Sequence, residues 1–336
     1  MSSALTATEI ARDARWLVQA LDHNAGVARL VAMDPEAYRN ASFLDDRMFQ
    51  QPTNAQLMPW TTLEEAVPLV GRNDSRWIFH IGHVGSTLLA RLLGELPTVL
   101  SIREPRSLRD VTAVSADKRV AYATALRTLF SRTFAPAEVT VVKATSFVSE
   151  IAPELTPPDG RALFMYATPR NYVASILAGE NSVQELRMLA PIRAERLAGR
   201  DLRLPPPRHD ADHAAIAWAC EMTSLEAGAT AMPDRRIGWI DFDRMLDDLT
   251  SALSTAAELI GIAANPDQLA RIAAGPLVSR YSKALEYEYS PKLRRDLIEQ
   301  ATREHRADIK DALAMLNEAA EKSRLLARAV ERSGED

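Results

Sequence analysis

A glycine-bearing turn between a buried strand and a helix is the part of the sequence best suited to chemistry. It lies in the stretch "RWIFHIGHVGSTLLARLL", residues 76–93. Gly82 and Gly85 let the backbone turn tightly, and the following helix offers unpaired N–H groups at its positive end. Ser86 and Thr87 add two hydroxyl donors there. These residues predict a cradle for a phosphate-like anion, and a strand–turn–helix joint without a ligand stays open as the alternative.

The lysine of a nucleotide-hydrolysing loop is missing from this turn. The motif G-x-x-x-x-G-K-[ST] requires a lysine directly after its last glycine. With Gly85 as that glycine, Ser86 takes the lysine position and His80 takes the position of the first glycine. The turn therefore departs from an ATPase loop at both key positions, and a P-loop kinase or NTPase is kept as a rival interpretation.

The same residues resemble another family. The loop is similar to the 5′-phosphosulfate loop of sulfotransferases that use 3′-phosphoadenosine 5′-phosphosulfate (PAPS), whose bacterial members read roughly [KR]-S-G-[ST]-T-x-L. Gly85, Ser86, Thr87 and Leu89 fit this pattern, whereas the basic first position is His83. A lysine there would bridge the transferring group, and a histidine does so when protonated or as a neutral hydrogen-bond donor.

A second stretch, "FMYATPRNYVASILAG" at 164–179, resembles the 3′-phosphate motif of that family. Pro169, Arg170 and Ser175 match the motif, and Ala167 stands where its first arginine is expected. The planar guanidinium of Arg170 suits a phosphate. The alternative is that Pro169 and Arg170 only begin a helix, as proline often does.

A third stretch, 278–294, resembles the segment that closes over the ligand near the C-terminal end of such sequences. The resemblance makes Arg280 and Lys283 contacts to the 3′-phosphate or the adenosine, in place of the arginine missing at 167. Solvated loop charges are the alternative for both. In all, the resemblance covers about residues 76–295.

Sulfuryl transfer, as the resemblance implies it, needs an anion cradle, a cation near the leaving oxygen and a base for the acceptor. Lys143 in "TVVKATSF" ends a predicted strand, where the family often has a lysine. The histidine base found two residues later in some branches is Thr145 here. Parallel sheets place ligands at the carboxyl ends of strands, which favours a functional Lys143 over a lysine that merely reaches solvent from a strand end.

Glu104 is the first candidate for the base. It lies in "VLSIREPRSL", directly after another predicted strand, and bacterial branches of the family often have a glutamate there. A crowded carboxylate can take a hydroxyl proton. An ion pair with Arg103 or Arg106 is the alternative. His80 and His83 are second candidates, and His80 on its buried strand fits a core histidine better.

Short apolar runs alternate with helical patterns from residue 76 onwards. Strands are expected at 76–81, 98–102, 139–144, 161–167 and 236–242, and helices near 86–96, 117–133, 170–178 and 209–229. This alternation predicts a parallel sheet covered on both faces. The expected fold is a P-loop-type three-layer α/β/α domain with a central parallel sheet and helical N- and C-terminal extensions. Its parts are a helical extension (1–70), the α/β core (71–262) and a ligand-closing segment with a helix (263–336).

The amino-acid composition limits the kinds of partner that the protein is expected to bind. The net charge of the 336-residue chain is -5, so its surface as a whole does not attract nucleic acid or an anionic membrane. A single cysteine, Cys220, suits a reducing cytoplasm, and neither a signal peptide nor a membrane-spanning run is evident. "RHDADH" at 208–213 places His209 and His213 four residues apart, but further zinc ligands are not identifiable.

The sequence therefore predicts a cytoplasmic PAPS-dependent sulfotransferase of bacterial type, which releases 3′,5′-ADP, needs no metal and acts on a hydroxyl of a small-molecule acceptor. A non-catalytic nucleotide-binding protein with the same fold is the second rival. The terminal helix offers a surface for pairing into a homodimer. The expected catalytic residues are Glu104, His83 and Lys143, and the expected donor-binding residues are Gly82, Val84, Gly85, Ser86, Thr87, Leu88, Arg170, Ser175, Arg280 and Lys283.

Overall fold

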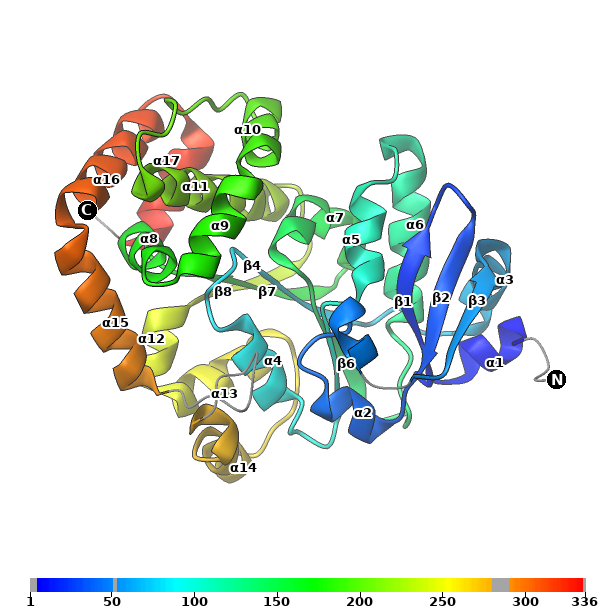
Figure 1. Cartoon of the computed structure of the whole chain (residues 1–336). Coiled ribbons are helices and arrows are strands. Elements are labelled where there is room, and N and C mark those ends of the chain that lie inside the picture. Colours follow the sequence, from blue (N-terminus) through cyan, green and yellow to red (C-terminus); the bar gives the residue numbers. More distant parts are fainter. Residues whose placement is uncertain (1–4, 51–52, 280–289, 335–336) are drawn as a thin grey trace.

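The computed structural model describes residues 5–50, 53–279 and 290–334, and these ranges contain two β-sheets. Figure 1 shows the larger sheet at the centre of the molecule, with helices on both sides, and the smaller sheet beside it. The N-terminal end of the chain lies next to the smaller sheet, and the C-terminal end lies on the opposite side of the molecule.

The larger sheet has five parallel strands in the order β5-β6-β4-β7-β8. Their bounds are Arg76–His80 (β4), Val99–Arg103 (β5), Val139–Lys143 (β6), Arg161–Tyr166 (β7) and Arg236–Asp241 (β8). Most of their residues are buried, as expected of a sheet covered on both faces. All five strands expected from residue 76 onwards are confirmed, and so is the layered α/β fold.

Helices cover both faces of this sheet. Figure 1 shows α4 (Ser86–Leu93), α13 (Leu249–Leu259) and α14 (Pro266–Ala273) on one side, and α5 (Arg106–Thr112), α6 (Ala116–Leu129), α7 (Ala152–Leu155) and α11 (Asp210–Thr230) on the other. The remaining elements of this part are α8 (Pro169–Leu177), α9 (Glu180–Met188), α10 (Ala190–Gly199), α12 (Phe242–Asp247), and the 3₁₀ helices η3 (Ser146–Ile151) and η4 (Pro276–Ser279).

The smaller sheet corrects the expectation of a helical extension at 1–70. Strands β1 (Trp16–Asp22), β2 (Val27–Ala32) and β3 (Ala55–Pro59) form an antiparallel sheet in that order. The short helical elements of this region are α1 (Ala7–Arg12), α2 (Pro35–Asn40), η1 (Asp46–Gln50), α3 (Trp60–Ala66) and η2 (Val67–Leu69). Helix α1 ends at Arg12, and the chain then forms the β1–β2 hairpin, in whose turn Gly26 adopts a φ of 64°.

Polar contacts join the smaller sheet and the segment 38–41 to α5 and to the edge strand β5. The hydroxyl of Ser107 donates to the carbonyl of Val18 over 2.7 Å, and Asp110 accepts from the backbone N–H of Leu21 over 2.8 Å. Arg103, which is 1% exposed, donates to backbone carbonyls of the segment 38–41, including Ala41 at 2.9 Å from its Nε. The N-terminal region and the edge strand β5 therefore share one interior.

The C-terminal part is helical, as expected. It consists of α15 (Pro291–Glu304), α16 (Arg306–Ala320) and α17 (Arg324–Ser333), and the last two pack against α11. Among the described residues, none of the helices is both long and apolar enough to cross a bilayer. The domain boundaries expected at 70 and 262 stay predictions.

Candidate functional site

The turn between β4 and α4 has the backbone of an anion cradle. Gly82 and Gly85 adopt φ values of 84° and 61°, in the left-handed region that favours glycine. A Cβ at Gly85 would lie 2.0 Å from the ring of Phe242, so this position also requires a glycine for space. The tight turn leaves the first N–H groups of α4 at the open end of the helix, where they suit an anion.

Thr87 supplies an unsatisfied polar atom at that end. Its side chain is 1% exposed, and its hydroxyl oxygen is buried with no hydrogen-bond partner among the described residues. Buried hydroxyls almost always have a partner, so an unpartnered hydroxyl at a helix N-terminus fits a ligand that accepts a hydrogen bond from it. The donor set of this loop therefore suits a phosphate or phosphosulfate group.

Two histidines flank the turn in different roles. The Nδ1 atom of His80 accepts the backbone N–H of Gly82 over 3.0 Å, so its Nε2 carries the proton and donates to the carbonyl of Ala144 over 2.8 Å. The buried ring of His80 therefore holds the loop in place through its hydrogen bonds, as expected of a core histidine. His83 adopts a φ of 55°, which is strained for a non-glycine residue, and its ring meets Tyr172 edge-on at 6.4 Å between centroids.

Glu104 and Lys143 meet at the carboxyl ends of neighbouring strands. Their side chains form a buried ion pair, and the backbone N–H of Glu104 donates to the carbonyl of Lys143 over 2.8 Å. Lys143 is 1% exposed, and Glu104 is 8% exposed with a φ of 52°. Strained backbone and buried charge coincide here, as is common at functional sites.

The expected alternative partners of Glu104 are engaged elsewhere. Arg103 is bound to backbone carbonyls, and Arg106 pairs with Asp46 and Asp110. Instead, the Nη2 atom of Arg47 lies 3.4 Å from the second carboxylate oxygen of Glu104. The carboxylate therefore faces two cations, of which only Lys143 was expected at the site.

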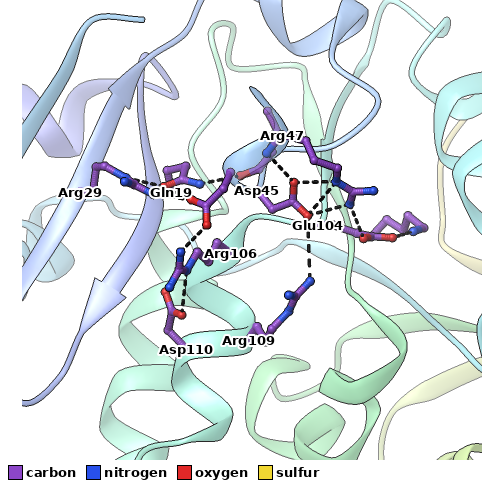
Figure 2. Close-up of polar contacts among 11 residues, drawn as sticks. Gln19, Arg29, Asp45, Arg47, Glu104, Arg106, Arg109 and Asp110 are labelled. Atoms are coloured by element: carbon purple, nitrogen blue, oxygen red, sulfur yellow. Dashed lines mark hydrogen bonds and ion pairs between the residues drawn. The ribbon is translucent and has the colours of Figure 1, made fainter. Parts of the chain in front are cut away.

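Arg47 belongs to a charged network that links the N-terminal region to the site (Figure 2). Its guanidinium binds Asp45 through two nitrogens, at 2.8 Å and 2.6 Å, and stacks on Phe43 with 3.4 Å to the ring centroid. From α5, Arg109 approaches Asp45, with 3.9 Å between its Nη2 and a carboxylate oxygen (Figure 2), and Arg106 pairs with Asp46. These contacts hold the segment 43–47 over Glu104, a contribution that no sequence motif signalled.

A cavity of about 1330 Å³ unites these groups. Of the expected residues, its lining includes the whole loop from Gly82 to Leu88, together with Glu104, Lys143 and Ser175. Arg170 is exposed and is not part of the lining, whereas Ser175, one turn and a half further along α8, is. Arg280 and Lys283 lie outside the described residues.

Arg294 is a cation that sequence reasoning passed over. It lines the cavity from α15 and stacks on Phe242, the ring that covers Gly85, at 4.4 Å from the centroid. Its Nε donates to Asp243 over 3.1 Å, and its Nη2 is buried without a hydrogen-bond partner in the described chain. The sequence did contain a pointer to Arg294, because this arginine is the last residue of the stretch 278–294, which resembles the closing segment.

His209 of "RHDADH" has a structural role. His209 caps α11, since its Nδ1 accepts the backbone N–H of Asp212 over 3.2 Å. Asp212 is bound by Arg208 at 3.1 Å. Within the described ranges, no group of three or more His, Cys, Asp or Glu side chains has the arrangement to hold a metal ion.

Comparisons with known proteins return solved structures of sulfotransferases. No protein-family model and no curated protein matches the chain. The sulfotransferase domain from the curacin biosynthetic pathway is 14% identical, with a TM-score of 0.41, over 73% of this chain and 98% of that one. The sulfotransferase domain of the Synechococcus PCC 7002 olefin synthase is 14% identical, with a TM-score of 0.40, over 68% of this chain and 87% of that one.

A third solved structure is the mouse sulfotransferase SULT7A1 complexed with PAP. It is 11% identical, with a TM-score of 0.40, over 78% of this chain and 89% of that chain. Identities and TM-scores are low throughout, so the function proposed below rests on this chain's own side chains. The family to which these solved structures belong is the one that the loop at 82–89 resembles.

Proposed function

We propose that the chain is a sulfotransferase that moves the sulfuryl group of PAPS to a hydroxyl of a small-molecule acceptor by in-line displacement. The observation that carries this proposal is one cavity that joins an anion cradle without a loop lysine to the buried Glu104–Lys143 pair. Transfer of this kind depends on positioning and on stabilising charge, and both groups serve those ends.

The donor would lie along the loop. The backbone N–H groups from His83 to Thr87 and the Thr87 hydroxyl would hold the 5′-phosphosulfate, because the N–H of Gly82 is already bound to His80. Arg294, with its orphaned Nη2, supports this end of the site as a second cation. Arg170 and Ser175 are proposed for the 3′-phosphate, in line with the motif that they resemble, and Arg280 and Lys283 stay proposed contacts to the same group.

At the reacting end, each of this chain's charged groups has a defined task. PAPS, when bound, supplies an activated sulfuryl group whose bond to the 5′-phosphate oxygen breaks as a bond to the acceptor oxygen forms. Glu104 takes the proton that the acceptor hydroxyl releases. Lys143 and His83 lie on the same cavity and offset the negative charge that develops on the leaving oxygen. Arg47 holds the Glu104 carboxylate in place.

The first test is ligand-dependent thermal stability. The protein is melted with 3′,5′-ADP, with 5′-ADP and with ATP, each with and without Mg²⁺. A ligand at about 100 times its Kd stabilises the folded state by roughly 2.7 kcal/mol, which shifts the melt measurably. A shift with 3′,5′-ADP that ignores Mg²⁺ supports the proposal. A shift with ATP that requires Mg²⁺, and none with 3′,5′-ADP, would sink it in favour of a kinase-like enzyme.

Transfer itself is then measured with radiolabelled PAPS and a panel of hydroxyl compounds. A protein that binds 3′,5′-ADP but labels none of them, and whose Glu104→Gln variant behaves identically, would match a non-catalytic nucleotide-binding protein instead. The proposal expects labelled product that depends on both the acceptor and Glu104.

A further inference from the structure

Two arginines that line the cavity have no role in the sulfuryl transfer proposed for the site. Arg193 and Arg196 of α10 both line the cavity and both stack on Phe147, with 5.4 Å and 4.3 Å from guanidinium carbon to ring centroid. Arg196 also donates to the carbonyl of Phe147 over 3.2 Å. The ring thus fixes two positive charges side by side on the cavity surface.

Arg193 has hydrogen-bonding capacity to spare. Its residue is 7% exposed, its Nε is buried without a hydrogen-bond partner in the described chain, and its Nη1 reaches the carbonyl of Leu186 only at 3.5 Å. Its ion pair with Glu221, at 3.6 Å from Nε, is too long for a hydrogen bond. A guanidinium has five N–H donors, so a buried one with a single long bond is suited to an anionic ligand.

Glu221, which pairs with Arg193, offsets only part of the positive charge of that arginine. It is 1% exposed, and neither of its carboxylate oxygens has a hydrogen-bond partner among the described residues. Burial raises the pKa of Glu221 to about 7, against the opposing effect of Arg193 and Arg196. Near neutral pH, Glu221 therefore spends part of its time uncharged, and it then offsets less of the positive charge on Arg193.

Part of the rim of the same cavity is apolar. Met188 and Ile192, from the α9–α10 region, and Leu293 and Leu297 of α15 all line it. They are nevertheless 72%, 42%, 44% and 44% exposed, which makes them prominent among the exposed large hydrophobic residues of the described chain. Exposed apolar side chains gathered around a cavity indicate a ligand with an apolar body.

The cavity has room for such a ligand beside the donor. A pocket of roughly 300–1,000 Å³ holds one drug-sized molecule, and this cavity measures about 1330 Å³. We propose that the acceptor is an amphiphilic hydroxy compound whose anionic group, a carboxylate or a phosphate, binds Arg193 and Arg196 while its apolar chain lies along the rim. This inference rests on the proposed function, because the hydroxyl end is taken to face Glu104.

The test uses matched acceptors. Transfer from PAPS is measured for ω-hydroxy carboxylates of increasing chain length, for their methyl esters and for the corresponding ω-hydroxyalkyl phosphates. We expect kcat/KM to favour one of the two anionic series over the esters by roughly tenfold or more, as befits hydrogen bonds to a charged group. The preferred series distinguishes carboxylate from phosphate as the recognised group.

Variants then assign the preference to residues. Arg193→Met, made alone and together with Glu221→Gln so that no buried carboxylate loses its partner, should raise KM for the anionic acceptor roughly tenfold or more. The half-buried Arg196→Met should act in the same direction. KM for the ester and the affinity for 3′,5′-ADP should not change. Arg187→Met is the matched control, because Arg187 is exposed, pairs with Asp210 and does not line the cavity.

A separate binding experiment tests the anion subsite independently of the proposed sulfotransferase function. The anionic acceptors are titrated calorimetrically into the protein without donor, and heat that disappears in Arg193→Met supports the anion subsite even if 3′,5′-ADP does not bind and the proposed function fails. Equal kcat/KM for carboxylate, phosphate and ester would overturn the inference. So would an Arg193→Met variant that loses affinity for 3′,5′-ADP instead of the acceptor, since Arg193 would then serve the donor.

Discussion

The ring of Phe242 occupies the space where Gly85 would carry a side chain, 2.0 Å from an ideal Cβ position. Gly85 also has a left-handed φ of 61°. Gly85→Ala should therefore lower the free energy of unfolding by at least about 2 kcal/mol, from backbone strain and overpacking together. Chemical denaturation measures this loss, and a titration with 3′,5′-ADP should show weaker binding.

Gly71→Ala is the control for that experiment. Gly71 has a φ of 66°, but no atom lies within 4 Å of its ideal Cβ position. The Gly71→Ala variant should lose only the part of the free energy of unfolding that comes from backbone strain, about 1–2 kcal/mol. It should keep its affinity for the nucleotide. Equal losses at the two glycines would contradict the close contact with Phe242.

Thr87→Val tests whether the orphaned hydroxyl serves a ligand. The replacement has nearly the same shape and removes a buried group without a partner. The free energy of unfolding should thus stay the same or rise by up to about 1 kcal/mol, whereas binding of 3′,5′-ADP should weaken by roughly fivefold or more. Differential scanning calorimetry and calorimetric titration measure the two quantities.

Thr156→Val should show the reverse behaviour. Its hydroxyl, fully buried, donates to the carbonyl of Ala152 over 2.9 Å. The variant should lose about 1 kcal/mol of stability and bind the nucleotide normally. If Thr87→Val were destabilised in the same way and still bound 3′,5′-ADP at full strength, the loop hydroxyl would have no part in the site.

Glu104→Gln separates the chemistry from the packing of the buried ion pair. The amide keeps the shape of the side chain but cannot take a proton, so the rate of sulfuryl transfer should fall roughly 10²-fold or more. Affinity for 3′,5′-ADP should be retained. A double-mutant cycle with Lys143→Met should give a coupling free energy of about 1 kcal/mol or more in unfolding experiments, because the two side chains are in contact. Full activity of Glu104→Gln would remove Glu104 as the base.

Stability should depend on pH through Glu221. Its pKa rises from 4.5 to about 7 on folding, mainly because burial disfavours the charged form. The folded state then binds more protons than the unfolded state between these values, so this group's contribution to stability falls as pH increases from about 4.5 to 7 and is level above. The total change is roughly 3 kcal/mol.

The comparison of wild type with Glu221→Gln isolates that contribution. Urea unfolding at several pH values should show the wild type losing stability relative to the variant as pH rises to 7. A stability difference that does not change with pH, or that moves in the wild type's favour, would show that folding does not raise the pKa of Glu221.

Much of the central sheet could be predicted from the sequence, because its strands are short runs rich in apolar residues, and most of these residues are buried. The N-terminal hairpin could not. The run "WLVQALD" at 16–22 contains helix-favouring leucine, alanine and glutamine, and it becomes a strand because it pairs with β2. Such pairing is a long-range effect that outweighs local propensity.

The candidate site shows a similar division. Loop residues such as Gly85 and Thr87 could be identified because glycines and hydroxyls at a strand–helix joint have a local signature. The contact of Glu104 with Arg47 could not: Arg103 is adjacent in sequence, yet the chain leaves β5 between the two residues, where Glu104 adopts a φ of 52°. Arg103 therefore reaches the carbonyls of 38–41, while the distant Arg47 arrives beside Glu104.

The cavity's lining runs from Phe43 to Ile298, and it therefore draws on nearly the whole described length of the chain. During synthesis on the ribosome, the nucleotide loop and the Glu104–Lys143 pair emerge long before α15 closes the last wall. A growing chain thus carries an unfinished and partly apolar chamber for most of its translation. Early release or pausing before residue 298 would expose that surface to other chains, so solubility of the nascent protein should depend on completing α15.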